Sequence, residues 1–316
     1  MDWERRSIRI CAAAVCCAVV LRLTGSGMLR PLAAAFSPER LASLVFYLET
    51  GRAIPPETEP PSAKAAEPTA PLPDRIEPDM DRVQIKYSGT YRPDLPDSPI
   101  SLNLRGDEPT VLILHTHTSE SYTKQSEDSW QETSDYHTLD EEANMLRVGD
   151  AVAARLESAG IGVIHDRSFH DVPSYNGSYN HARQSAEQLL AEYPGIRLVL
   201  DLHRDAVEVA GGQLDTAAWV KGQESAQLMF VVGTDEGGLE HPDWQENLAL
   251  AARLDGVLEA MYPGLCRPIS LRRERFNQHL SPGALLVEVG AAGNTLAEAL
   301  TAADALCDGI LALTEP

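Results

Sequence analysis

Apolar and polar positions along residues 108–316 form blocks that predict strands and helices in turn. Short apolar runs, which predict buried strands, lie at 110–114, 161–164, 196–202, 228–232 and 284–289. Longer segments with apolar residues at helical spacing lie at 141–159, 178–192, 244–260 and 294–313. Gly160 and the Asn294–Thr295 pair stand where helix boundaries are expected. This alternation predicts an α/β fold, with a mostly parallel or mixed sheet that carries helices on both faces.

A different pattern occupies the N-terminus. The uninterrupted apolar run ICAAAVCCAVVL, residues 10–21, lies between Arg9 and Arg22. A basic flank before an apolar run is typical of a signal peptide or signal anchor. The run is shorter than the about 20 residues of a spanning helix. We expect residues 1–30 to be an uncleaved membrane anchor; a cleaved signal and a buried helix of the globular domain are the alternatives.

Two segments connect this anchor to the α/β domain. Residues 31–53 have apolar positions at the spacing of a short amphipathic helix. Residues 54–107 hold 11 of the 21 prolines of the chain, a composition typical of an extended spacer. The order predicts a tethered protein, in which anchor, amphipathic segment and Pro-rich spacer precede a catalytic domain at 108–316.

The charge balance argues against one class of partner. The 316 residues include 47 Asp and Glu but only 26 Lys and Arg, for a formal net charge of −21. Phosphate backbones are bound by clustered Lys and Arg, so we expect no nucleic-acid partner. The sequence also lacks the phosphate-loop motifs and the serine-hydrolase elbow. Cys266 and Cys307, the cysteines outside the N-terminal apolar run, fit no zinc-binding spacing.

Polar clusters follow two of the predicted strands. They are His115-Thr116-His117-Thr118-Ser119-Glu120 and Asp201-Leu202-His203-Arg204-Asp205. Sites in open α/β sheets lie at the carboxyl ends of strands, and imidazole with carboxylate suits a hydrolytic zinc. The candidate ligands are His117, Glu120 and His203. Asp201, on the same face of its strand as His203, is a supporting partner or an alternative ligand.

Glu288 is the candidate general base. It lies between Val287 and Val289, where an unpaired charge is costly, so we expect a cation or metal nearby. Burial would raise the pKa of its carboxyl towards the range of a base that takes a proton from water. A salt-bridged carboxylate is the plain alternative. Arg204 is expected to stabilise an oxyanion or bind a substrate carboxylate, or else to pair with Asp201 or Asp205.

The remaining histidines have weaker signals, and most are expected to be surface or turn residues. They are His137, His165, His170, His181, His241 and His279. His165 and His170 are each followed by an aspartate, and the loop that they flank is a candidate wall of a cleft.

Several segments follow one another in a recognisable order. They are VLILHTHTSESY (111–122), NMLRVG (144–149), AGIGVIHD (159–166), PSYNGSYNHAR (173–183), LVLDLHRDA (198–206), FVVG (230–233), FNQHLSPGALLVEVG (276–290) and NTLAEAL (294–300). In this order they resemble the catalytic domain of the stage II sporulation protein P family, with Leu202 in place of the family's isoleucine. The resemblance covers roughly residues 108–316.

The resemblance implies an amidase-like, phosphorylase/hydrolase-like fold and a zinc-dependent peptidoglycan hydrolase. Such an enzyme, similar to N-acetylmuramoyl-L-alanine amidases, cleaves the amide between the muramic lactyl group and the first alanine of the stem peptide. Cleavage of peptide cross-links is a further implied activity. By position, His203 matches a histidine ligand and Glu288 the base. The first ligand is His115 or His117, which strand alternation places on one side. Glu120 is the carboxylate ligand, with Glu142 in reserve.

The resemblance also implies a setting for the reaction. Tyr175, Tyr179 and Asn277 are expected to line the cleft for the glycan of the substrate. Stage II sporulation proteins D and M are the implied partners. The implied location is the extracytoplasmic face of the sporulation septum or engulfing membrane, where the chain would act during engulfment. A zinc peptidase that acts only on stem peptides and a non-enzymatic wall-binding scaffold are the competing functions.

Overall fold

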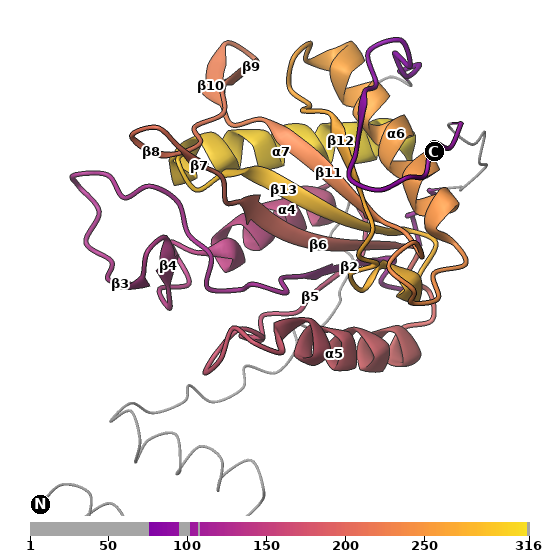
Figure 1. Cartoon of the computed structure of the whole chain (residues 1–316), viewed down its shortest axis with the longest axis horizontal. Coiled ribbons are helices and arrows are strands. Elements are labelled where there is room, and N and C mark those ends of the chain that lie inside the picture. The colour runs from indigo at the N-terminus through magenta and orange to yellow at the C-terminus, as the bar shows by residue number, and fades with distance from the viewer. Residues whose placement is uncertain (1–75, 95–101, 107, 315–316) are drawn as a thin grey trace, which may run out of the picture. The chain divides into compact units, whose positions relative to one another are not determined.

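A seven-stranded sheet organises the domain, with the strand order β1-β12-β11-β13-β6-β2-β5 (Figure 1). The computed structural model describes residues 76–94, 102–106 and 108–314, all within one unit that spans 63–316. The predicted anchor, the amphipathic segment and the first part of the spacer lie outside the described residues. Among the helices of the described part, none is long and apolar enough to cross a membrane.

The sheet is mixed. The strands of one group run parallel to one another: β13 (Ala284–Ala291), β6 (Leu198–Asp205), β2 (Val111–Leu114) and β5 (Val163–His165). The other group, also parallel within itself, contains β1 (Ile85–Tyr87), β12 (Ile269–Arg272) and β11 (Leu228–Gly233). The two groups join where β11 pairs antiparallel with β13. The carboxyl ends of β2, β6 and β13 therefore share one edge of the sheet.

Helices cover both faces, which confirms the predicted fold class (Figure 1). On one face lie α4 (Met145–Ser158), α6 (Trp244–Met261) and α7 (Leu296–Leu313), with α7 in contact with both of the others. The other face is packed against α5 (Ser178–Glu192). Buried Ala182 and Ala186 of α5 lie in one cluster with Val199 of β6 and Ala284 of β13.

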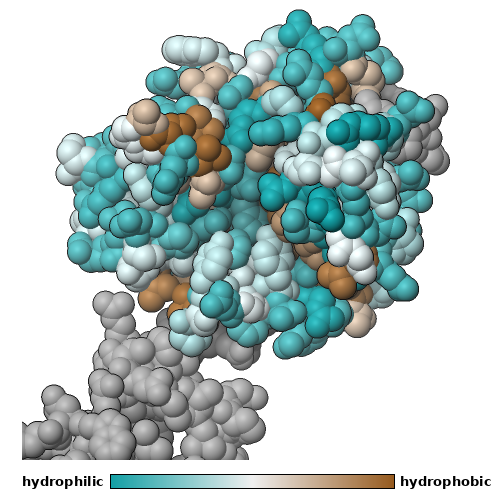
Figure 2. Space-filling view, in the orientation of Figure 1, coloured by the Kyte–Doolittle hydropathy of each residue, from teal (hydrophilic) through white to brown (hydrophobic). Residues whose placement is uncertain are grey.

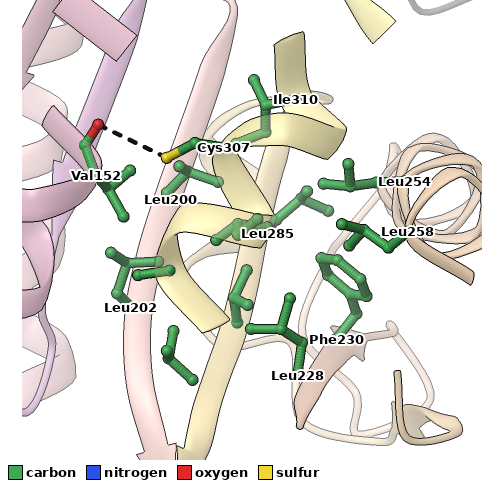
Figure 3. Packing of buried hydrophobic residues seen from close by; sticks show 14 of the residues in the cluster. Val152, Leu200, Leu202, Leu228, Phe230, Leu254, Leu258, Leu285, Cys307 and Ile310 are labelled. Carbon is green, nitrogen blue, oxygen red and sulfur yellow. Dashed lines mark hydrogen bonds between the residues drawn. The ribbon is translucent and has the colours of Figure 1, made fainter. Parts of the chain in front are cut away.

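The side chains of β6 alternate between these faces. Leu200 and Leu202 point towards α7, where they pack near Leu285 and Cys307 in the larger core (Figure 3). The Cys307 thiol donates to the carbonyl of Val152 in α4 at 3.8 Å, so α7 is fixed to its neighbour as well as to the sheet. Full burial of a leucine contributes about 1.5–3 kcal/mol. Because the leucines occupy the even positions, Asp201 and His203 are left on the α5 face.

Helix boundaries follow local signals. α4 begins four residues later than the predicted start because the side chain of Asn144 accepts from the Leu146 amide and caps the helix. Gly160 follows its end with φ +80°, a conformation that favours glycine. In α7, Thr295 and Glu298 form a capping box, which confirms the boundary expected at 294–295.

The predicted Pro-rich spacer, residues 54–107, includes segments that are part of the folded domain. β1 pairs with β12 as an edge strand, and Leu102 and Leu104 are buried in the core, so these parts of 54–107 belong to the domain. Val83, Ile85 and Tyr87 pack against the core at alternate positions, a strand pattern that the surrounding prolines obscured. Other elements were not predicted: β12, the short helix η2 (Gln278–Leu280), and the two-stranded pairs β3 (Glu132–Ser134) with β4 (His137–Thr138), β7 (Glu208–Val209) with β8 (Gly212–Gln213), and β9 (Ala218–Val220) with β10 (Gln223–Ser225).

Candidate active site

Strand register places two of the predicted site residues side by side. Glu288 of β13 is the Cα partner of His203 in β6, so both side chains leave the sheet on the α5 face. Leu114, the last residue of β2, is the partner of Asp201. The segment that follows Leu114 therefore enters the same region, and the structure brings His117, Glu120, His203 and Glu288 together.

His203 lies between two carboxylates. Its Nδ1 is 3.4 Å from Glu120 Oε2, and its Nε2 is 3.0 Å from Asp201 Oδ1. The Nε2–Asp201 contact does not have hydrogen-bond geometry, so Nε2 is left without a hydrogen-bond partner. Burial alone would lower the pKa of His203, but the carboxylates of Asp201 and Glu120 outweigh it and raise this pKa. The environment of His203 thus favours positive charge.

Asp201 supports the site from the sheet. Its carboxylate accepts from the amide and the hydroxyl of Thr116, at 2.8 and 2.6 Å, which ties β6 to the segment after β2. Burial would raise the pKa of Asp201, but the charge of His203 and the bonds from Thr116 lower it. This arrangement gives Asp201 the supporting position considered for it.

Glu120 and Arg204 form a buried pair. Arg204 Nη1 lies 3.6 Å from Glu120 Oε1, and burial is outweighed by Arg204 and His203, which hold the pKa of Glu120 at about 2. The Arg204 guanidinium also donates to the carbonyls of Ser121 and Tyr136, at 3.0 and 2.9 Å. It contacts neither Asp201 nor Asp205, the pairing partners considered from the sequence. Its donors are directed at the protein itself.

His115 and His117 do not share one side, contrary to the expectation from strand alternation. β2 ends at Leu114, and turns follow, so the period of two no longer applies. His115 Nδ1 donates to the carbonyl of Leu202 at 3.1 Å, and its Nε2 lies 2.8 Å from Nε2 of His165. Burial and the neighbouring His165 lower the pKa of His115 to about 3. Both of its nitrogens are engaged away from the other candidate ligands.

His117 instead faces His203. The centroids of the two rings are 5.2 Å apart, and the Tyr175 ring stacks on His117 at 4.2 Å with an interplanar angle of 3°. The Tyr179 ring meets His117 edge-on at 5.5 Å. Nδ1 of His117 is buried and has no hydrogen-bond partner, and burial lowers the pKa of this imidazole. The structure therefore favours His117 over His115 as the first ligand.

Glu288 is only partly exposed, and its Oε2 has no hydrogen-bond partner. Burial raises the pKa of its carboxyl to about 8. No salt bridge involves Glu288 among the described residues, so the plain alternative of a salt-bridged carboxylate finds no partner there. Glu142 lies elsewhere: its side chain is 83% exposed and lies 3.8 Å from Arg147.

The loop after β5 contributes residues that the sequence left undecided. Asp171 accepts from the amide and the hydroxyl of Ser119, at 3.0 and 2.6 Å, and so fixes the turn that carries His117 and Glu120. His170 pairs with Asp166 at 2.9 Å and is buried in a bend, and His241 is buried as well, so neither is a surface residue. The His-Asp dipeptides were the available signal for this loop.

The remaining predicted substrate residues lie near His117, because the rings of Tyr175 and Tyr179 contact it. Tyr175 is 55% exposed, and Asn277 donates to the Tyr179 carbonyl at 2.9 Å. Figure 2 shows that the face it draws is hollowed near its centre and that mainly hydrophilic residues surround the hollow. Such a surface suits a polar substrate.

The donor atoms of this site suit a metal ion by type, although the side chains are not arranged around one. Within residues 76–94, 102–106 and 108–314, no group of three or more His, Cys, Asp or Glu side chains is arranged to hold one as the side chains stand. The donor chemistry nevertheless fits a divalent cation, because imidazoles and carboxylates meet where positive charge is favoured. His117 Nδ1, His203 Nε2 and Glu288 Oε2 are all buried without hydrogen-bond partners. The residues thus fit zinc by donor type.

Comparison with known proteins gives the family. The model of the stage II sporulation protein P family matches residues 50–311. The chain belongs to this family. A stage II sporulation protein P from Bacillus subtilis (strain 168) is 32% identical over 216 residues, which are 64% of this chain and 50% of the relative. The chain therefore spans about half the length of the curated relative that it matches.

Two of the solved structures that match are amidases. The N-acetylmuramyl-L-alanine amidase Ami1 of Mycobacterium smegmatis has a TM-score of 0.41 at 15% identity. The match covers 67% of this chain and 98% of Ami1. AmiC2 of Nostoc punctiforme has a TM-score of 0.39 at 16% identity, with 64% and 95% of the two chains covered.

Proposed function

We propose that the chain is a zinc-dependent peptidoglycan hydrolase that cleaves the amide between the muramic lactyl group and the first alanine of the stem peptide. The observation that carries the proposal is the gathering of buried, unpartnered polar atoms of His117, His203 and Glu288 on one face of the sheet. Buried polar groups are normally hydrogen-bonded, so a cluster of exceptions is typical of a reaction site. Membership of the stage II sporulation protein P family supports a role in sporulation.

His117, Glu120 and His203 would hold the metal. Bound zinc supplies Lewis-acid polarisation of the scissile carbonyl and of water. Arg204 keeps Glu120 ionised and in place, so we assign it a positioning role instead of the expected contact with an oxyanion or a substrate carboxylate. Asp201, with its Oδ1 3.0 Å from Nε2 of His203, supplies negative charge beside this imidazole.

Glu288 is the general base. Its unpartnered Oε2 lies beside His203, where it takes a proton from the attacking water and passes it to the leaving nitrogen. The amide bond between lactyl carbon and alanine nitrogen breaks, and the water oxygen stays on the lactyl carbonyl carbon. Tyr175 and Tyr179, whose rings both contact His117, and Asn277 would line the path of the substrate.

The biological setting is proposed from the family. We place the chain at the extracytoplasmic face of the sporulation septum or engulfing membrane, held by residues 1–30, with stage II sporulation proteins D and M as partners. Cleavage of peptide cross-links is a proposed second activity.

The deciding experiment is mass spectrometry of peptidoglycan treated with the full chain, with zinc or with a chelator. We expect intact stem peptides to be released only when zinc is present. The Glu288→Gln variant should lose roughly 10²–10⁴-fold in rate while it keeps wild-type zinc content. Release of cut stems alone would replace the amidase by a peptidase, and no product in any condition would favour the scaffold. Wild-type turnover of the variant would contradict the base assignment.

A further inference from the structure

A groove lined by three arginines begins at the edge of the candidate active site. It has a volume of about 580 Å³, and its walls are the first turns of α5 and the segment 273–277 between β12 and β13. The residues that matter for its chemistry are Tyr179, Arg183, Arg273, Arg275, Phe276 and Asn277. Clefts of this size hold small ligands. Tyr179 joins the two sites, because its ring also contacts His117 at 5.5 Å.

The groove concentrates positive charge on a chain whose net charge is −21. Its single lining carboxylate among the described residues, Glu274, is already contacted by Arg272 at 3.4 Å. Arg275 donates to the backbone carbonyl of Glu240, a contact that leaves its charge unneutralised. Arg183 is paired with Glu187 at 3.2 Å. The groove therefore has cationic groups to offer to a ligand.

Arg273 is the most available of the three arginines. Its exposed side chain makes no hydrogen bond or ion pair within the described part of the chain. The charge of Arg273 acts on Glu236, whose carboxylate accepts from the amide and hydroxyl of Thr90. Hydrogen bonds from Thr90, and then the charge of Arg273, lower the pKa of Glu236. Arg183 and Arg275 both lie close enough to His279 to affect it. Burial and the two positive charges lower the pKa of His279 to about 4.

We propose that this groove binds the carboxylates of the stem peptide, an inference that rests on the proposed amidase function. The scissile amide joins a neutral N-acetylated glycan to a peptide that carries free carboxylates. The guanidinium groups of Arg273 and Arg275 match carboxylates in shape and charge, and hydroxyl groups of the glycan match them less well. The peptide limb of the substrate therefore leaves the site past Tyr179 along the groove, and the glycan lies on the side of Tyr175.

The test is calorimetric binding of a free stem tetrapeptide to the full chain. This peptide lacks the scissile bond, so the result stands even if no amidase activity is found. We expect the peptide with free carboxylates to bind about tenfold or more tightly than the same peptide with amidated carboxylates. Arg273→Ala and Arg275→Ala should remove that difference, and Arg273→Lys should restore part of it. Arg197→Ala changes an exposed arginine before β6 that does not line the groove, and it is the matched control.

Four results would overturn the proposal. One is equal binding of the free and amidated peptides. The second is a carboxylate preference that survives both alanine variants, and the third is one that the Arg197→Ala control abolishes equally. A phosphate-containing wall polymer that binds in an Arg273-dependent manner, while the peptide does not, would also reject the stem peptide as occupant.

Discussion

His115 and His117, two residues apart in the sequence, lie in two regions that differ in how fully their hydrogen bonds are satisfied. On the α4 side, His115 bonds to the Leu202 carbonyl and to His165, and His165 Nδ1 lies 3.0 Å from Asp150 Oδ1. On the α5 side, His117 lies against His203, and a nitrogen of each has no hydrogen-bond partner. Every imidazole nitrogen of the first region is engaged, and the second region holds unused donors and acceptors.

The hydrogen bonds of the α4 side form one continuous chain from Leu202 to Asp150. The Leu202 carbonyl accepts from Nδ1–H of His115, so neutral His115 accepts at Nε2 from His165. Asp150 accepts from the other nitrogen of His165, and all of these bonds form together only if His165 is protonated at both nitrogens. Such a completed chain stabilises a fold, because each buried group has its partner. Incomplete sets such as His117, His203 and Glu288 are what a ligand or reaction uses.

The largest expected effect is a difference in zinc content between the His117→Ala and His115→Ala variants. His117→Ala should abolish zinc binding at micromolar metal and with it hydrolysis. The loss should exceed the roughly 10–100-fold that removal of an outer partner costs. Elemental analysis after dialysis against a weak chelator measures it. His115→Ala is the matched control and should retain zinc. The opposite pattern would make His115 the ligand and break the comparison.

The sequence predicted the members of the α5-side cluster but not the separation of the histidines. Strand alternation and the strand-end rule were enough to place His203 and Glu288 near each other. They failed at His115 and His117 because β2 ends at Leu114, and a turn has no period. Helix α5 was predicted with its observed bounds, since helical periodicity needs no tertiary information. β1 was missed because its three residues gain their stability only by pairing with distant β12.

The next effect is on stability, and here His115→Ala is expected to cost more than His117→Ala. His115→Ala should lower the free energy of unfolding by about 1–3 kcal/mol, because it leaves buried partners at Leu202 and His165 unsatisfied. His117→Ala removes a ring whose Nδ1 has no partner and should cost less. Urea denaturation of the chelated proteins gives both values. Equal losses would mean that the bonds of His115 add nothing beyond packing.

A smaller effect is expected at Gly149, where α4 packs closely against His115 and His165. A Cβ at Gly149 would lie 2.4 Å from His165 Nε2 and 2.5 Å from His115 Nε2. Glycine inside a helix costs about 1 kcal/mol relative to alanine, so Gly149→Ala would ordinarily stabilise α4. Here we expect destabilisation. In a His165→Ala background the penalty should shrink or change sign, as measured by a double-mutant cycle. Stabilisation by Gly149→Ala alone would show that the histidine pair moves freely.

The smallest effect is the pH dependence that Asp150 gives to the α4 side. Burial would raise its pKa, but bonds from His165 and Arg167 outweigh it and hold the pKa at about 2, below the ordinary 3.8. A carboxyl with a lowered folded-state pKa stabilises the fold above its unfolded-state pKa, and this contribution is lost as the pH falls. Wild type should therefore exceed Asp150→Asn in urea midpoint above pH 4, with the gap closing between about pH 4 and pH 2. Because the Asp150 side chain is 38% exposed, solvent screening keeps the gap small. Measured on chelated protein, a gap that stayed constant down to pH 2 would mean that Asp150 acts through packing. The completed hydrogen-bond chain would then end at His165, and the contrast with the α5 side would rest on His115 alone.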